Sequence, residues 1–148
     1  MTTISDHLIR KHSGEYDPEV VTRLSLVKQS LTEISNLDRC SSLTYLDLSN
    51  NDISLIMGLD HIESLKRLDL SCNKIEILGS GLSANVNLIS LNLKGNLIRD
   101  MNQLGGLASL EKLESLHLRD ESGKDANPVC ADEGYVGYVQ KTLKSLTL

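Results

Sequence analysis

Leucine recurs along the chain in a fixed pattern of hydrophobic and polar positions. The pattern Leu-x-x-Leu-x-Leu occurs four times, and a weaker copy that begins with Val precedes them. The copies start near residues 21, 43, 65, 88 and 113, so that consecutive starts lie 22 to 25 residues apart. Alternation of leucine with other residues is typical of a short strand whose side chains point in turn into the core and into solvent. We therefore expect one short strand in each unit.

An asparagine follows three of these copies at the same offset, as Asn51, Asn73 and Asn96. An asparagine side chain offers two donors and an acceptor, so it can satisfy backbone groups that a turning chain leaves unpaired. Stacked units would align these side chains in a hydrogen-bonded structural ladder. Gln29 and Glu121 occupy the equivalent place in the first and fifth units, and we expect the ladder to weaken at both ends.

The repeat resembles that of the leucine-rich-repeat family, in which units of 20–29 residues stack because none can bury its leucines alone. The resemblance implies an α/β fold, a right-handed leucine-rich-repeat solenoid of about five repeats with a parallel concave sheet and helical caps at both ends. Units this short predict short helices or 3₁₀ turns on the convex side. The longer third and fourth units should bulge there, near residues 79–81 and 104–107.

The segment 1–20 is expected to form an N-terminal helical cap over the repeats, which occupy 21–120. Apolar residues share one side of an amphipathic helix over 4–13, and Gly14 suits its end. Asp17 and Pro18 then suit the start of a further helical turn. A cap is needed because an open sheet edge promotes aggregation.

The remaining segment, 121–148, predicts a C-terminal cap. A polar loop comes first, then helical apolar spacing from Tyr135 to Leu146, and a final Leu146-x-Leu148 strand. The residues 127–130 resemble the C-terminal cap of the short leucine-rich-repeat proteins similar to the phosphatase regulator suppressor of dis2. Those proteins typically end in an acidic motif, and this chain stops at Leu148 before it. A truncated cap, and a longer parent protein, therefore stay open.

Composition narrows the function classes. The formal net charge of −5 argues against direct contact with nucleic acid, which needs a basic surface. No apolar run is long enough for a membrane span, and the first residues lack the pattern of a secretory signal. The three cysteines do not form a disulfide framework; we expect Cys40 and Cys130 to be buried and Cys72 partly exposed. A cytoplasmic location fits best, and the nucleus stays open.

The concave face is the candidate protein-binding surface. Its residues alternate with the strand leucines, so their side chains point out of the core into solvent. Its centre is predicted to be Tyr45, Asp47, Arg67 and Asp69, since Tyr and Arg often dominate binding energy. A basic partner residue would relieve the like charges of the two facing aspartates. In the competing interpretation the arginines simply neutralise the aspartates. The full candidate set is Arg23, Tyr45, Asp47, Arg67, Asp69, Asn92, Lys94, His117 and Arg119.

Catalysis and metal binding are not expected. An open concave surface does not enclose an ion or shield a carboxylate from water. The histidines and cysteines lack zinc spacing, so no metal, cofactor or catalytic residue is predicted. We expect a monomeric protein-interaction module or scaffold rather than an enzyme. The alternatives are a regulatory subunit of an enzyme such as a protein phosphatase, or an assembly factor of a ribonucleoprotein complex; the resemblance suggests both.

Overall fold

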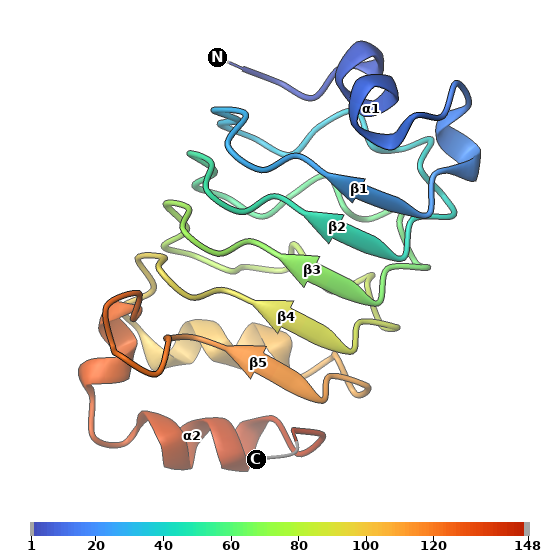
Figure 1. Cartoon of the computed structure of the whole chain (residues 1–148). Helices are drawn as coiled ribbons and strands as arrows, with labels where there is room; N and C mark the ends of the chain where they lie inside the picture. Colours follow the sequence, from blue (N-terminus) through green and yellow to red (C-terminus); the bar gives the residue numbers. More distant parts are fainter. Residues whose placement is uncertain (1, 147–148) are drawn as a thin grey trace.

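The computed structural model describes residues 2–146 as a curved stack of coils whose strands form one five-stranded parallel sheet (Figure 1). Strand order follows the sequence, so each coil packs only against its neighbours. The predicted solenoid fold is therefore confirmed. Each strand is three residues long: β1 Arg23–Ser25, β2 Tyr45–Asp47, β3 Arg67–Asp69, β4 Ser90–Asn92 and β5 Ser115–His117.

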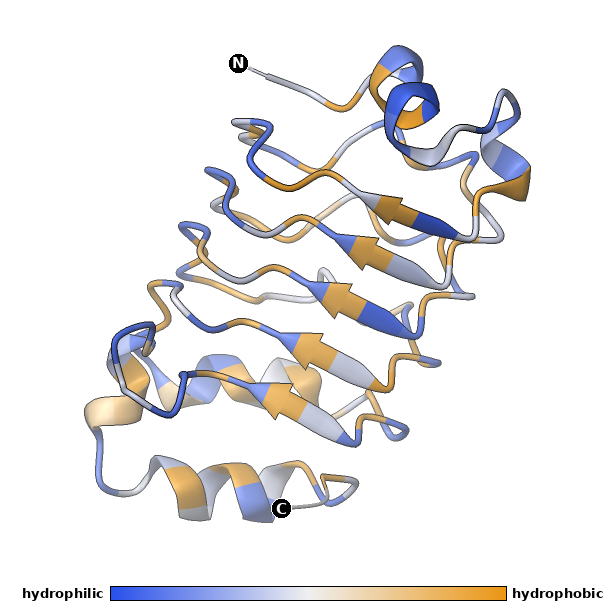
Figure 2. Ribbon diagram, in the orientation of Figure 1, coloured by the Kyte–Doolittle hydropathy of each residue, from blue (hydrophilic) through white to orange (hydrophobic). Residues whose placement is uncertain are grey.

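The central leucine of each strand lies in register with the next, as the repeat spacing predicts. Leu24, Leu46, Leu68 and Leu91 are at most 2% exposed, and Figure 2 shows this hydrophobic stripe along the sheet. Leucine and isoleucine fill the core, which contains no phenylalanine or tryptophan. Burying each such side chain stabilises the fold by about 1.5–3 kcal/mol.

The asparagine ladder has the predicted form. The Nδ2 of Asn73 donates to the carbonyls of Leu48 and Leu70, both at 3.0 Å. Its Oδ1 accepts from the Ile53 amide at 3.0 Å. Asn51 and Asn96 make the matching bonds one coil on either side. These bonds satisfy backbone groups that would be costly to bury unpaired.

The ladder does not weaken at its C-terminal end, so that prediction is wrong. Glu121 is exposed, and Asn127 takes its place: its Nδ2 donates to the carbonyls of Leu93 at 2.7 Å and Leu118 at 2.8 Å. The Asn127 Oδ1 accepts from the Ile98 amide at 3.1 Å. The polar loop between Leu118 and Asn127 is an insertion that leaves the coil and returns, so the fixed offset fails. At the other end Gln29 donates to the Val27 carbonyl of its own unit, as expected of a weaker end.

The N-terminal segment folds over β1. Helix α1, Asp6–Ser13, occupies the predicted helical segment; the Ser5 Oγ accepts from the Leu8 amide at 3.2 Å, and Gly14 ends the helix with φ of 79°. A 3₁₀ turn, η1 Pro18–Val20, follows, and the Asp17 side chain caps it. Glycine suits this helix end because φ there lies in the left-handed region.

The convex side and the C-terminal cap contain the remaining helical elements. The enlarged fourth unit forms a 3₁₀ helix, η2 Met101–Leu107. The cap consists of η3 Pro128–Ala131 and helix α2 Tyr135–Thr142, which packs on η2 and η3 beyond β5 (Figure 1). The predicted Leu146-x-Leu148 strand lies partly outside the described residues.

Candidate functional site

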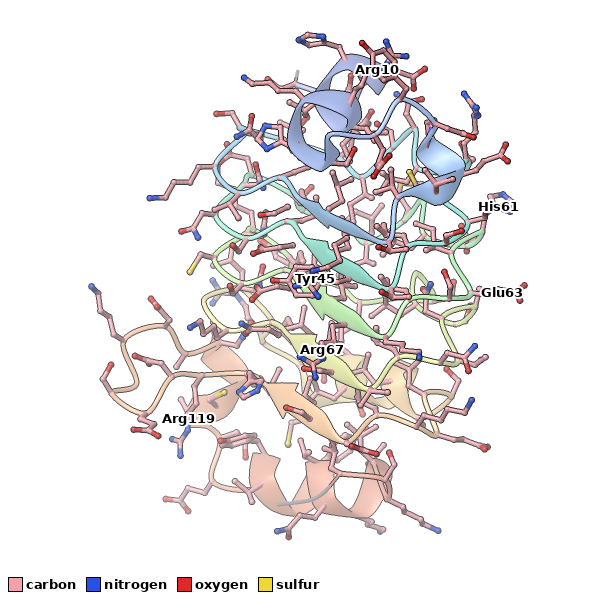
Figure 3. All side chains as sticks on the ribbon, turned by 45° about the vertical axis from the view of Figure 1, so that its right-hand side comes forward. Arg10, Tyr45, His61, Glu63, Arg67 and Arg119 are labelled. Atoms are coloured by element: carbon pink, nitrogen blue, oxygen red, sulfur yellow. The ribbon has the colours of Figure 1, made fainter. Side chains whose placement is uncertain are left out.

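Strand register places the candidate side chains in rows on the concave face. Arg23, Tyr45 and Arg67 occupy one row on successive strands. In the next row Asp47 faces Asp69, and Asn92 faces His117. Figure 3 shows Tyr45 and Arg67 over the middle of the sheet, with Arg119 nearer its C-terminal end.

Arg23 and Tyr45 form a stacked pair. The guanidinium carbon of Arg23 lies 4.2 Å from the centroid of the Tyr45 ring, within the range of a cation–π interaction. Burial, and then the charges of Asp47 and Asp69, raise the pKa of Tyr45. The phenol therefore stays protonated near neutral pH and can donate a hydrogen bond. Both side chains are held on a strand, which lowers the entropy cost of fixing them on binding.

The two facing aspartates are satisfied by hydrogen-bond donors rather than by the arginines. The Asp69 Oδ1 accepts from the amide and the hydroxyl of Ser71, at 2.8 and 2.6 Å, and its Oδ2 accepts from the Asn92 Nδ2 at 2.8 Å. The Asp47 Oδ1 accepts from the Ser49 amide at 3.0 Å. Within residues 2–146 no ion pair joins either aspartate to Arg23 or Arg67. The aspartates thus help to fix the backbone at the strand ends.

A shallow hollow of about 200 Å³ lies at the centre of the sheet. Five candidate residues, from four successive strands, surround it with Leu68 and Ser90: Tyr45, Arg67, Asp69, Asn92 and His117. Arg67 and His117 are exposed, and the Ser115 Oγ lies 2.9 Å from the His117 Nε2. This arrangement presents a cation, a phenol, a carboxylate and an amide to one space.

Four other candidates lie outside this hollow, and one of them is Asp47 of β2, described above. Arg23 stacks on Tyr45, on the side of the hollow nearer the N-terminus of the chain. Lys94 lies past the end of β4, close enough for its charge to lower the pKa of Cys72, although burial raises that pKa more strongly. Arg119 lies past the end of β5, with its guanidinium carbon 5.9 Å from the Tyr135 ring centroid. The candidate set therefore spans the sheet rather than forming one cluster.

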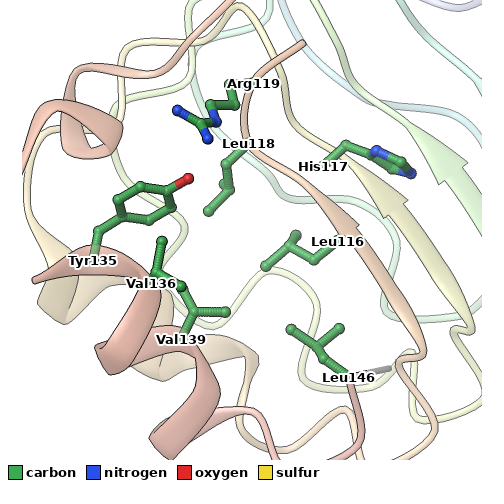
Figure 4. Close-up of a pocket in the computed structure, with 8 residues that line it drawn as sticks. All are labelled: Leu116, His117, Leu118, Arg119, Tyr135, Val136, Val139 and Leu146. Atoms are coloured by element: carbon green, nitrogen blue, oxygen red, sulfur yellow. The ribbon is translucent and has the colours of Figure 1, made fainter. Parts of the chain in front are cut away.

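A second pocket, of about 220 Å³, lies between β5 and α2, and the sequence pattern does not reveal it. In Figure 4 aliphatic side chains from the strand, the helix and the segment after the helix point toward one another. Arg119 and Tyr135 lie at one side, and His117 points away at the other. The eight lining residues are Leu116, His117, Leu118, Arg119, Tyr135, Val136, Val139 and Leu146.

The described residues include no group of three or more His, Cys, Asp or Glu side chains placed to hold a metal ion. Burial raises the pKa of all three cysteine thiols, so their thiolate fraction is small at neutral pH. Cys40 is buried and Cys72 partly exposed, as predicted; Cys130 is partly exposed rather than buried. Between residues 2 and 146 no helix is long and apolar enough to cross a membrane.

Comparisons with known proteins agree with this geometry. The family model described as leucine-rich repeat matches residues 1–148. A chain in the crystal structure of the Drosophila melanogaster SNF/U2A′ complex is 30% identical with a TM-score of 0.85, and the match covers 100% of this chain and 83% of that one. A search of curated proteins finds no match.

An internalin, InlF, and the functional domain of InlJ, both from Listeria monocytogenes, are also similar. InlF is 27% identical with a TM-score of 0.66, and the match covers 77% of this chain and 35% of that one. InlJ is 19% identical with a TM-score of 0.55, and the match covers 75% of this chain and 21% of that one. This likeness supports the fold alone. With the family model matching its full length and the repeats stacked in register, the chain belongs to the leucine-rich-repeat family.

Proposed function

We propose that the domain binds a protein partner on its concave face, centred on Tyr45, Arg67 and the neighbouring aspartates. The observation that carries the proposal is the central hollow, where side chains from four strands open onto one space. Concave surfaces of solenoids provide extended binding sites of this kind. Rigid strands also reduce the ordering cost that a binding site pays.

Arg67 is the charged group with the most unused hydrogen-bonding capacity in this hollow. Asp69 already accepts three hydrogen bonds, whereas the exposed Arg67 guanidinium makes no ion pair within residues 2–146. A partner carboxylate opposite Arg67 therefore fits better than a basic residue opposite the aspartates. Arg and carboxylate can pair through two parallel hydrogen bonds, which also fixes orientation.

The test is a crosslinking pull-down with mass spectrometry that compares the native domain with Arg67→Glu. Arg99→Glu is the matched control, because it makes the same change in net charge at an exposed arginine past the ladder residue Asn96. We expect a partner captured by the native domain and by Arg99→Glu but lost with Arg67→Glu. Equal capture by all three forms would place binding away from the hollow and refute the proposal.

Membership of a larger assembly is a second candidate role. It is favoured by the match to a chain crystallised in a complex with another protein, SNF/U2A′. We propose that a ribonucleoprotein assembly role would act through protein contacts, because the net charge of −5 opposes direct binding of nucleic acid. Protein partners that stay bound to the domain after nuclease treatment would support this role. Loss of every partner on nuclease treatment would contradict it.

Regulation of an enzyme such as a protein phosphatase would use the same concave site. The test is whether the rate of that enzyme changes when the purified domain is added, and Arg67→Glu should leave the rate unchanged. We also propose that the domain acts as a monomer in the cytoplasm or nucleus. The segments 12–16 and 127–131 resemble those of leucine-rich-repeat-containing protein 61, and on them we propose that subgroup.

A further inference from the structure

The core of the last strand is incompletely covered. The central leucines of β1 to β4 are at most 2% exposed, but Leu116 of β5 is only partly buried. Both β1 and β5 have a neighbouring strand on one side only, but α1 packs directly on β1, whereas α2 packs on η2 and η3. Helix α2 lies beyond β5 and leaves the pocket of about 220 Å³ above Leu116 (Figure 4).

The pocket is apolar at its base and basic at its rim. Leu116, Leu118, Val136, Val139 and Leu146 supply the aliphatic walls, and Val136 is 43% exposed. None of the eight lining residues is acidic, and Arg119 is the permanent cation among them. Ligand pockets usually measure about 300–1,000 Å³. A space below that range suits one side chain better than a small molecule.

His117 connects this pocket to the concave hollow, because it lines both. A bound segment could therefore cross from the hollow over β5 and reach the pocket without leaving the surface. Arg119 lies on that route, and within residues 2–146 it forms no ion pair. Its contact is with the Tyr135 ring, 5.9 Å away, which leaves guanidinium donors for a carboxylate.

We propose that the C-terminal pocket receives one large apolar side chain of the partner segment, and that an acidic residue of the same segment pairs with Arg119. The inference rests on the proposed function and names the chemistry of its partner. Covering an aliphatic side chain of this size raises affinity roughly tenfold to a hundredfold. The carboxylate adds specificity, because a basic residue at that place would meet Arg119.

The first test uses a phage-displayed library of random peptides, selected on the native domain and depleted on Val136→Lys. This substitution puts a charge into the pocket at a partly exposed site on α2, so the fold should tolerate it. We expect enriched peptides to share a Leu, Ile, Met or Phe beside an Asp or Glu. Failure to enrich any peptide, or enrichment of apolar residues beside Lys or Arg, would overturn the proposal.

The second test is a charge exchange with an enriched peptide, followed by fluorescence polarisation. Arg119→Glu should weaken binding about tenfold or more, and changing the peptide acid to Lys should restore it. Arg99→Glu is the control, because it makes the same change in net charge at an exposed arginine that lines neither the pocket nor the hollow. If the peptide with Lys does not restore binding to Arg119→Glu, the proposed pairing of Arg119 with an acidic residue is wrong. Unfolding midpoints of all variants establish that each is folded.

The outcomes separate this inference from the proposed function. If a partner is lost with Arg67→Glu but binds Val136→Lys normally, the concave site stands and the pocket inference fails. If Val136→Lys and Arg119→Glu weaken binding while Arg67→Glu does not, the pocket stands and the central hollow fails. Light scattering tests whether a second copy of this chain fills the pocket instead. A concentration-dependent dimer that Val136→Lys abolishes would show such a copy and would overturn the proposal.

Discussion

Replacing Asn51 with alanine should destabilise the fold more than the same replacement at Asn73, although both residues occupy the same place in the ladder. The difference lies in which backbone groups lose their last partner. The carbonyl of Leu48 accepts from both asparagines, at 2.8 Å from Asn51 and 3.0 Å from Asn73, so either substitution leaves it one donor. The carbonyl of Leu26, at the start of the ladder, accepts from Asn51 alone among the described residues.

The magnitudes follow from counting these orphaned groups. Without Asn51, the buried Leu31 amide and the Leu26 carbonyl both lose their partner, and so does the half-buried Gln29 amide, which water can reach more easily. Without Asn73, the Ile53 amide alone does so, because the Leu70 carbonyl keeps its bond from Asn96. Each buried unsatisfied group costs about 1–3 kcal/mol. Asn51→Ala should therefore lose about 2–6 kcal/mol and Asn73→Ala about 1–3 kcal/mol from this cause.

Urea unfolding followed by circular dichroism would measure both free energies. Equal unfolding slopes are required, since a repeat protein can lose two-state behaviour. Asn102→Ala is the control, because this exposed residue makes no side-chain hydrogen bond within residues 2–146. Both ladder substitutions remove the same side-chain atoms from buried sites, so the side-chain volume lost is the same in the two variants. Equal losses, or a larger loss for Asn73→Ala, would refute the argument from orphaned groups.

Three further predictions concern the coil, the core and the concave row. Gly81→Ala should destabilise the fold by about 1–3 kcal/mol in thermal unfolding, because its Cβ would lie 1.9 Å from the Ile56 carbonyl oxygen; an unchanged midpoint would contradict this close approach. Burial, then the charge of Asp6, raises the pKa of Cys40 above 9.0, so the unfolded thiol ionises first and stability should fall as pH rises past 9.0. Cys40→Ala should flatten that decline, and an unaltered pH profile would exclude the thiol as its cause. Asn92→Asp should place a carboxylate against Asp69, costing about 1–3 kcal/mol, and adding Asp69→Asn should recover most of the loss in a double-mutant cycle; additive losses would show that the pair does not interact.

The spacing of the leucines was sufficient to predict the strands and their register. A unit of near-constant length returns the chain to the same place, so residues such as Asp47 and Asp69 must face each other. The same reasoning failed at Asn127, because the inserted loop changes the offset without changing the ladder. The sequence does contain a signal for this position: the next asparagine after Glu121 is Asn127, and a proline follows it directly.

Other features depend on packing that periodicity does not encode. Asn85 occupies the place of the buried Cys40 and Ile62 in earlier units, yet its Nδ2 donates to the carbonyls of Leu59 and Ile62, both at 3.0 Å. The C-terminal pocket depends on how closely α2 approaches β5, which no repeat specifies. The concave centre was identifiable as a set of residues, but its use of Asp69 as a backbone cap required the hydrogen bonds themselves.

The C-terminal pocket has its origin in the way a solenoid ends. Inside the stack, each strand leucine is covered by equivalent leucines on both sides, and the concave residues are spaced by the same sheet. At β5 the repetition stops, so a helix of different geometry must cover a surface shaped for another strand. The mismatch leaves Leu116 partly exposed beside Arg119, at the end of the row that His117 continues. The spacing of the repeat does not constrain the cap residues, so this end of the sheet can have a shape that the repeat itself does not produce.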